Sequence, residues 1–206
     1  KLLNKETFEK SIDFKLNQKN ILVTFHSVTL ENSTAGQQFQ ELLNAIDELK
    51  DTNIIFTKVN SDTDGRIINQ MINEYVVKNP HKSIAFTSLG QLRYLSALQF
   101  IDAMVGNSSS GLTEAPSFKI GVINMGDRQR GRIKADNVID CMSNKESILK
   151  AFKELYSNKF QNALEGVKNP YGDGFASKEI IKKLKKIKLN GILKKSFYDI
   201  KIYHNK

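Results

Sequence analysis

The chain has 206 residues, of which 40% are hydrophobic and 26% are charged, a composition that excludes wholesale disorder. Its only cysteine, Cys141, excludes an internal disulfide framework and favours a reducing compartment, so we expect a cytoplasmic protein. No apolar stretch approaches the roughly 18 residues that a membrane span needs, and the first residues do not resemble a signal peptide. The chain starts at Lys1 rather than Met, as a piece of a longer protein would.

The net charge of +9 is concentrated near the C-terminus. Residues 178–195 contain eight lysines and one acid, Glu179, which leaves a balance of only about +2 for the rest of the chain. A run of this kind is usually a solvated helix face, and the alternative is a basic module that binds nucleic acid or an anionic membrane. We favour the solvated face and expect neither nucleic acid nor membrane as a partner.

Short apolar, β-branched runs alternate with amphipathic segments along the chain. Strands are predicted at residues 21–26, 53–59, 82–87, 102–106, 120–125 and 137–141. Helices are predicted from the apolar stripes at 39–49 and 67–75, and at 89–100, 143–156 and 176–189. The fourth of these is expected to start at a capping box formed by Ser143 and Glu146.

Strands that alternate with helices predict βαβ crossovers and an α/β fold with a Rossmann-like, doubly wound parallel sheet. We expect one such domain over residues 20–190, preceded by a polar lead-in or interdomain segment at 1–19 and followed by a tail at 191–206.

In sheets of this kind, ligands bind at the carboxyl ends of the strands. Polar residues follow each of the first five predicted strands, and these are His26, Asn60-Ser61-Asp62, Ser88, Asn107-Ser108-Ser109-Ser110-Gly111 and Gly126-Asp127-Arg128-Gln129. We expect these groups to converge on one edge of the sheet.

The strongest local signal is VGNSSSGLTEAPSF, residues 105–118. Ser108 and Ser109 precede a short predicted helix, whose first N–H groups and dipole would favour an anion. Glu114 follows and could accept two hydrogen bonds from a ribose diol. The alternative is plain serine N-capping beside a solvated glutamate.

Two further residues are candidates because of their position. His26 closes a buried strand and is either a structural hydrogen-bonding group or, at the ligand edge, a partner for a phosphate. The loop GDRQRGR, 126–132, contains three arginines, and Arg128 is the nearest to its strand end.

Other site classes lack their residues. His26, His81 and His204 do not have metal-ligand spacing, and one cysteine cannot build a structural zinc site, so we expect no metal and no cofactor. No GxSxG, GxxxxGK[ST] or GxGxxG motif is present. Cys141 is expected to be a small core residue.

At these motifs the chain resembles the C-terminal half of the UDP-N-acetylglucosamine 2-epimerase family. It is most similar to the hydrolysing bacterial branch that makes N-acetylmannosamine or related sugars for sialic-acid-type biosynthesis. The resemblance runs through segments in the same order, namely TFHSVTLE, SLGQLRYLSAL, GNSSSGLTEAPSF, GDRQRGRI and NPYGDGFAS.

The resemblance implies the nucleotide-binding domain of a two-domain GT-B enzyme, with the N-terminal domain absent. Ser108 and Ser109 would hold the diphosphate of a UDP-sugar, and Glu114 the ribose. His26 would assist the departure of UDP. Asn60, Ser88 and Arg128 would be supporting contacts around the nucleotide.

The implied reaction removes the proton at C2, expels UDP and then adds water with inversion at C2. The resemblance places the catalytic acids in the absent N-terminal domain, so we expect the isolated chain to be inactive; it also implies a homodimer. Two alternatives stay open, the donor domain of a GT-B glycosyltransferase and the basic module described above.

Overall fold

The structure, a computed structural model, describes residues 1–28, 34–60 and 64–194. The chain divides into two compact units, residues 1–171 and 172–206. This division differs from the prediction of one domain over residues 20–190. Ser61 and Asp62, and most of the predicted tail, lie outside the described residues.

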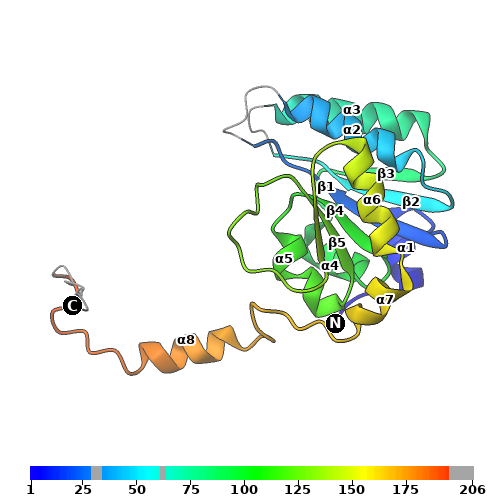
Figure 1. Cartoon of the computed structure of the whole chain (residues 1–206). Coiled ribbons are helices and arrows are strands. Elements are labelled where there is room, and N and C mark those ends of the chain that lie inside the picture. Colours follow the sequence, from blue (N-terminus) through cyan, green and yellow to red (C-terminus); the bar gives the residue numbers. More distant parts are fainter. Residues whose placement is uncertain (29–33, 61–63, 195–206) are drawn as a thin grey trace. The chain divides into compact units, whose positions relative to one another are not determined.

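A six-stranded parallel sheet forms the centre of the first unit (Figure 1). Its strands are β1 (Lys19–Thr24), β2 (Thr52–Thr57), β3 (Ser83–Phe86), β4 (Ala103–Gly106), β5 (Gly121–Met125) and β6 (Val138–Cys141). They lie in the order β3-β2-β1-β4-β5-β6, so the direction of winding reverses between β1 and β4. The predicted Rossmann-like, doubly wound sheet is therefore confirmed, and each strand end lies within two residues of its prediction.

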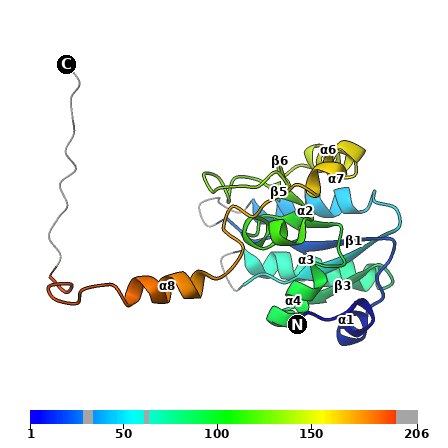
Figure 2. The same ribbon diagram turned by 90° about the horizontal axis from the view of Figure 1, so that it is seen from below.

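Helices cover both faces of this sheet, as Figures 1 and 2 show. One face is covered by α2 (Ala35–Ile46), α3 (Gly65–Lys78) and α6 (Lys145–Leu155). The other is covered by α1 (Lys5–Ile12), α4 (Gly90–Ala97) and the short pair α5 (Ser110–Thr113) and η1 (Ala115–Phe118). α7 (Asn158–Leu164) follows α6, and α8 (Ala176–Leu184) belongs to the second unit.

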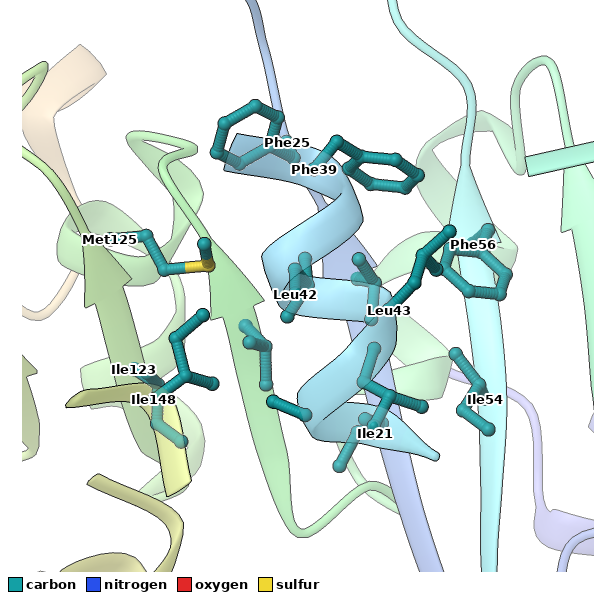
Figure 3. Close-up of a cluster of buried hydrophobic side chains, with 14 of the residues drawn as sticks. Ile21, Phe25, Phe39, Leu42, Leu43, Ile54, Phe56, Ile123, Met125 and Ile148 are labelled. Carbon is teal, nitrogen blue, oxygen red and sulfur yellow. The ribbon is translucent and has the colours of Figure 1, made fainter. Parts of the chain in front are cut away.

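The larger core cluster lies between the sheet and α2, as Figure 3 shows. Phe39 and Leu42 of α2 are fully buried against Ile21 of β1 and Phe56 of β2. These side chains come from both the amphipathic stripe of α2 and the apolar face of the strands. Their packing holds α2 against β1 and β2, the strands that end at Thr24 and Thr57.

Helix α1 lies within the segment that was expected to be a polar lead-in. Its Phe8 is fully buried and Ile12 is 2% exposed, and both belong to the core cluster on the α4 face of the sheet. Asn4 caps the helix, with its side chain accepting a hydrogen bond from the Thr7 N–H. Leu3, Phe14 and Leu16 of the same segment also pack against this cluster, so the segment docks on the sheet and is not a polar lead-in.

The start of α6 corrects the predicted capping box. Asn144, not Ser143, is the N-cap, and its Oδ1 accepts from the Ser147 N–H at 2.9 Å. The Ser147 hydroxyl in turn accepts from the Met142 N–H at 3.1 Å. Asparagine is as good an N-cap as serine, so the two adjacent candidates could not be separated by residue type.

Candidate functional site

The carboxyl ends of the central strands are brought together by the parallel register. Thr24 at the end of β1 pairs with Thr57 of β2 on one side and with Gly106 of β4 on the other. The hydroxyls of Thr24 and Thr57 are hydrogen-bonded at 2.6 Å. The residues that follow these strands therefore start from one row along the edge of the sheet.

A cavity of about 560 Å³ opens at this edge. Four residues singled out in the sequence line it, namely His26, Ser88, Ser108 and Glu114. Its other lining residues are Thr24, Thr57, Lys58, Thr87, Leu89, Gly90, Gln91, Tyr94, Leu95 and Ser110. The cavity lies beside the point where the strand order reverses, which is where α/β sheets of this type bind ligands.

Asn107 holds His26 in place. The Asn107 side chain accepts a hydrogen bond from the His26 N–H and donates one to the His26 carbonyl, each at 2.7 Å. The Asn107 N–H also donates to the Thr24 carbonyl. The side-chain amide thus continues the pairing of β1 and β4 beyond the last strand residue, and it fixes the backbone from which the His26 imidazole projects.

Gly106 allows the chain to pass close to β1 at this point. Its φ is +132°, and a Cβ placed on it would lie 2.0 Å from the Thr24 carbonyl oxygen. Both the backbone conformation and the space require glycine.

The segment after Gly106 is more compact than the predicted anion-binding helix. α5 has only four residues, and the Ser110 N–H already donates to the Ser108 hydroxyl at 3.3 Å. A single turn aligns few peptide dipoles, so its field at an anion is weak. Glu114 ends this turn half-buried, and its carboxylate accepts from the Thr113 hydroxyl at 2.9 Å.

Tyr94 forms part of the cavity wall from α4. Its hydroxyl donates to the Ser110 hydroxyl at 2.7 Å, which ties α4 to α5. Burial, together with the nearby Glu114 carboxylate, raises the pKa of Tyr94 to about 12. The phenol therefore stays protonated at neutral pH and keeps donating this hydrogen bond.

Three of the predicted site residues do not line the cavity. Ser109 is half-buried, and its carbonyl accepts from Leu112 and Thr113. Asn60 is exposed at the end of a described segment. Arg128 is also exposed and donates to the Asn107 carbonyl at 3.0 Å, where Gln129 donates at 2.7 Å.

Two lining residues, Lys58 and Tyr94, were missed by the sequence reasoning, and so was the role of Asn107 beside the cavity. Lys58 falls inside the predicted strand 53–59, whereas β2 ends at Thr57 and leaves Lys58 at the ligand edge. Tyr94 looked like one more apolar member of a helix stripe. Asn107 was noted among the residues after a strand, but its capacity to pair with another strand end could not be inferred without knowing which strand is its neighbour.

A second cavity of about 640 Å³ lies at the ends of β5 and β6. It is lined by Val28, Gln38, Asn107, Met125, Gly126, Asp127, Asp140, Cys141, Met142, Ser143 and Ser147. Cys141 is half-buried, packs against the larger core cluster as expected, and also lines this cavity. Burial and the adjacent Asp140 raise the pKa of its thiol to about 12, so the thiol is protonated and unreactive at neutral pH.

The described part of the chain has no group of three or more His, Cys, Asp or Glu side chains that could hold a metal ion. None of its helices combines the length and the apolar character needed to cross a bilayer.

Comparison with known proteins identifies the family. The model of the UDP-N-acetylglucosamine 2-epimerase family matches residues 2–185. This chain belongs to that family. The resemblance seen in the motifs is thereby confirmed, and it extends over both sides of the cavity.

The curated relatives are about twice as long as the chain. A Campylobacter jejuni GDP/UDP-N,N'-diacetylbacillosamine 2-epimerase (hydrolyzing) is 42% identical over 96% of this chain and 51% of the relative. An Escherichia coli polysialic acid biosynthesis protein P7 is 34% identical over 97% of the chain and 51% of the relative. The chain therefore spans about half the length of the curated relatives it matches.

Solved structures share the fold. An S. aureus MnaA–UDP co-structure superposes with a TM-score of 0.68 at 23% identity, covering 94% of this chain and 50% of the other. A Neisseria meningitidis UDP-GlcNAc 2-epimerase bound to UDP-GlcNAc gives a TM-score of 0.62 at 20% identity, covering 89% and 48%. In both cases the chain corresponds to one half of the larger structure.

Proposed function

We propose that this chain is the nucleotide-binding half of a hydrolysing UDP-sugar 2-epimerase. One observation carries the proposal most directly, namely the cavity in which His26, Ser108 and Glu114 meet at the reversal point of the sheet. Membership of the epimerase family supports it. The names of the relatives support a UDP-linked 2-acetamido sugar as the substrate class.

Each of the three residues has a role that its position can support. Glu114 can accept hydrogen bonds from the two ribose hydroxyls, because its carboxylate lines the cavity and accepts from only one recorded donor, the Thr113 hydroxyl. Ser108 can donate its hydroxyl to a phosphate oxygen. His26 can hydrogen-bond the phosphate oxygen that leaves C1, and can donate a proton to it when the imidazole is charged.

The overall reaction is a balanced elimination followed by hydration. A base removes the proton from C2 while the bond from C1 to the UDP oxygen breaks, and the electron pair of the C2–H bond becomes the C1–C2 double bond. Water then adds across that bond, with the hydroxyl at C1 and the proton at the opposite face of C2. The products are free UDP and the sugar with inverted configuration at C2.

The base and the acid for C2 are proposed to come from the half of the enzyme that this chain does not span. Proton transfer at carbon needs a positioned carboxylate or imidazole on each face of the sugar. The relatives have a further half in which such groups can lie. The isolated chain is therefore proposed to bind UDP without turning over a UDP-sugar, and the whole enzyme is proposed to be a homodimer.

Calorimetric titration of UDP tests this proposal. We expect binding of the unaltered chain at micromolar to millimolar affinity, and at least about tenfold weaker binding by Glu114→Ala, since two charge-assisted hydrogen bonds are lost. Glu154→Ala is the matched control, because this glutamate is exposed on α6, outside the cavity. Absence of UDP binding at millimolar concentration, both alone and with the N-terminal half of a relative added in trans, would contradict the proposal.

A further inference from the structure

The cavity holds one cationic side chain that neither the motifs nor the family comparison singles out. Among its lining residues, Lys58 is the only lysine or arginine and Glu114 the only carboxylate. No ion pair recorded among residues 1–28, 34–60 and 64–194 includes Lys58. Lys58 therefore lines the cavity, and no carboxylate in the described part of the chain lies at ion-pair distance from its ammonium group.

The backbone of Lys58 is fixed although it lies beyond the last strand residue. Its N–H donates to the Phe86 carbonyl at 2.8 Å, which continues the pairing of β2 with β3. Lys58 is half-buried. The ammonium group therefore starts from a rigid edge of the sheet rather than from a loop, and the lysine stem can reach over the cavity floor.

The sheet order places three polar groups in a row. β2, β1 and β4 are adjacent, and they are followed by Lys58, by His26 after one intervening residue, and by Ser108 after one intervening residue. Neighbouring strands are about 4.8 Å apart, so the row spans roughly 10 Å. A diphosphate that is held at Ser108 and passes His26 therefore points its far end toward Lys58.

A diphosphate bound in the cavity needs a positively charged side chain such as Lys58 beside it. A nucleoside diphosphate carries about three negative charges near neutral pH. The one-turn helix α5 contributes little positive field, and Arg128, which donates to the Asn107 carbonyl, does not line the cavity. Arg93, another nearby cation, donates to the carbonyls of Leu89 and Ser11. Without Lys58, the described lining would present one carboxylate and no permanent cation to the phosphates.

We infer that Lys58 binds the terminal phosphate of the nucleoside diphosphate and so sets the preference for a diphosphate over a monophosphate. This inference rests on the proposed function. In the elimination, the bond from C1 breaks at the oxygen of that same phosphate, which gains negative charge as UDP leaves. An ammonium group at this position stabilises the departing oxygen more than it stabilises the intact sugar ester.

The test compares UDP, UMP and uridine as ligands of the same chain by calorimetry. In Lys58→Gln we expect UDP to bind roughly ten- to a hundredfold more weakly, because a hydrogen bond between two charged groups is lost. UMP and uridine are expected to change by less than about threefold. Lys58→Arg is expected to retain most of the preference for UDP over UMP, since it keeps the charge.

Lys50→Gln is the matched control. Lys50 is exposed near the opposite end of β2, so this variant makes the same change of charge outside the cavity and should bind UDP as the unaltered chain does. Uridine binding reports in each variant whether the cavity is folded.

Two results would overturn the inference alone. These are an unchanged affinity of Lys58→Gln for UDP, or an equal loss of affinity for UDP and UMP while the unaltered chain prefers UDP. If the unaltered chain binds none of the three ligands, with or without the N-terminal half in trans, the proposed function falls and the inference falls with it.

Discussion

Apolar side chains are buried in one of the two compact units of the chain and exposed in the other. In residues 1–171, Phe39 of α2 and Phe56 of β2 are fully buried with ring centroids 6.4 Å apart. In the other unit, every described residue from 172 to 194 is exposed, including Ile181 at 52% and Leu184 at 61%. Both units contain helices with apolar periodicity, so periodicity predicts a helix but does not predict that the helix has something to pack against.

The units also differ in charge, and net charge alone would point to the wrong unit as the site of anion binding. The lysines of 178–194 that the structure describes are all exposed, whereas the candidate binding cavity contains one lysine, Lys58. A half-buried single cation interacts with a ligand more strongly than many solvated ones, because water screens the latter. The most basic segment of a sequence is therefore a poor guide to its anion site.

The largest expected difference between the units is in how much the loss of an apolar side chain lowers the free energy of unfolding. Phe56→Ala should lower the free energy of unfolding by about 3–5 kcal/mol, because it removes a fully buried ring that contacts Phe39 and Tyr75. Leu184→Ala, in the exposed unit, should change it by less than about 0.5 kcal/mol. Urea unfolding followed by circular dichroism measures both, and equal losses would remove the distinction drawn between the units.

A smaller, pH-dependent effect is expected at the N-terminal helix of the first unit. The ammonium of Lys15 at 2.8 Å and the Leu16 N–H at 3.0 Å hold the pKa of Glu9 below its usual value of 4.5. A carboxyl with a lowered pKa in the folded state contributes stability above its unfolded pKa, and that contribution is lost as the pH falls through the folded pKa. Glu9→Gln should therefore lower stability near neutral pH but not at about pH 3.

Thermal unfolding of both proteins between about pH 7 and pH 3 checks this expectation. The curves of stability against pH should converge at the acid end. A constant gap across the range would show that packing, not ionisation, is what Glu9 contributes.

The smallest effect is expected from removing residues 172–206. The cavity is lined by residues between 24 and 114, and no described residue after 171 is buried. The shortened chain should keep its unfolding midpoint in urea and bind UDP within about twofold of the full chain. A clear drop in either quantity would show that the second unit supports the first.

The sheet was predictable because its strands are continuous apolar runs, which parallel strands buried on both faces require. Helix α1 was harder to place, since Phe8 and Ile12 are too few to outweigh the lysines and glutamates around them by pattern alone. The N-cap of α6 was misplaced by one residue because Ser143 and Asn144 are chemically equivalent caps.

The candidate site was predictable in outline for a different reason. The rule that ligands meet the carboxyl ends of parallel strands led to His26, Ser88 and Ser108, and the motif at 105–118 led to Glu114. All four line one cavity. Tyr94 and Lys58 also line it. Whether these two residues reach the cavity depends on which face of α4 packs on the sheet and on where β2 ends. Packing between segments far apart in the sequence decides both.

The pairing of His26 with Asn107 also bears on how the protein folds. The two residues are 81 positions apart, and the strands that precede them, β1 and β4, adjoin only because β2 and β3 are placed on the other side of β1. Contacts of such separation carry a large loop-closure entropy and form late. A chain emerging from the ribosome can pair β1, β2 and β3 before residue 107 exists, but His26 is then held by nothing from β4. Nucleotide affinity should therefore appear only after the first three strands and helices α1–α4 have formed, once the segment after β4 has packed beside β1.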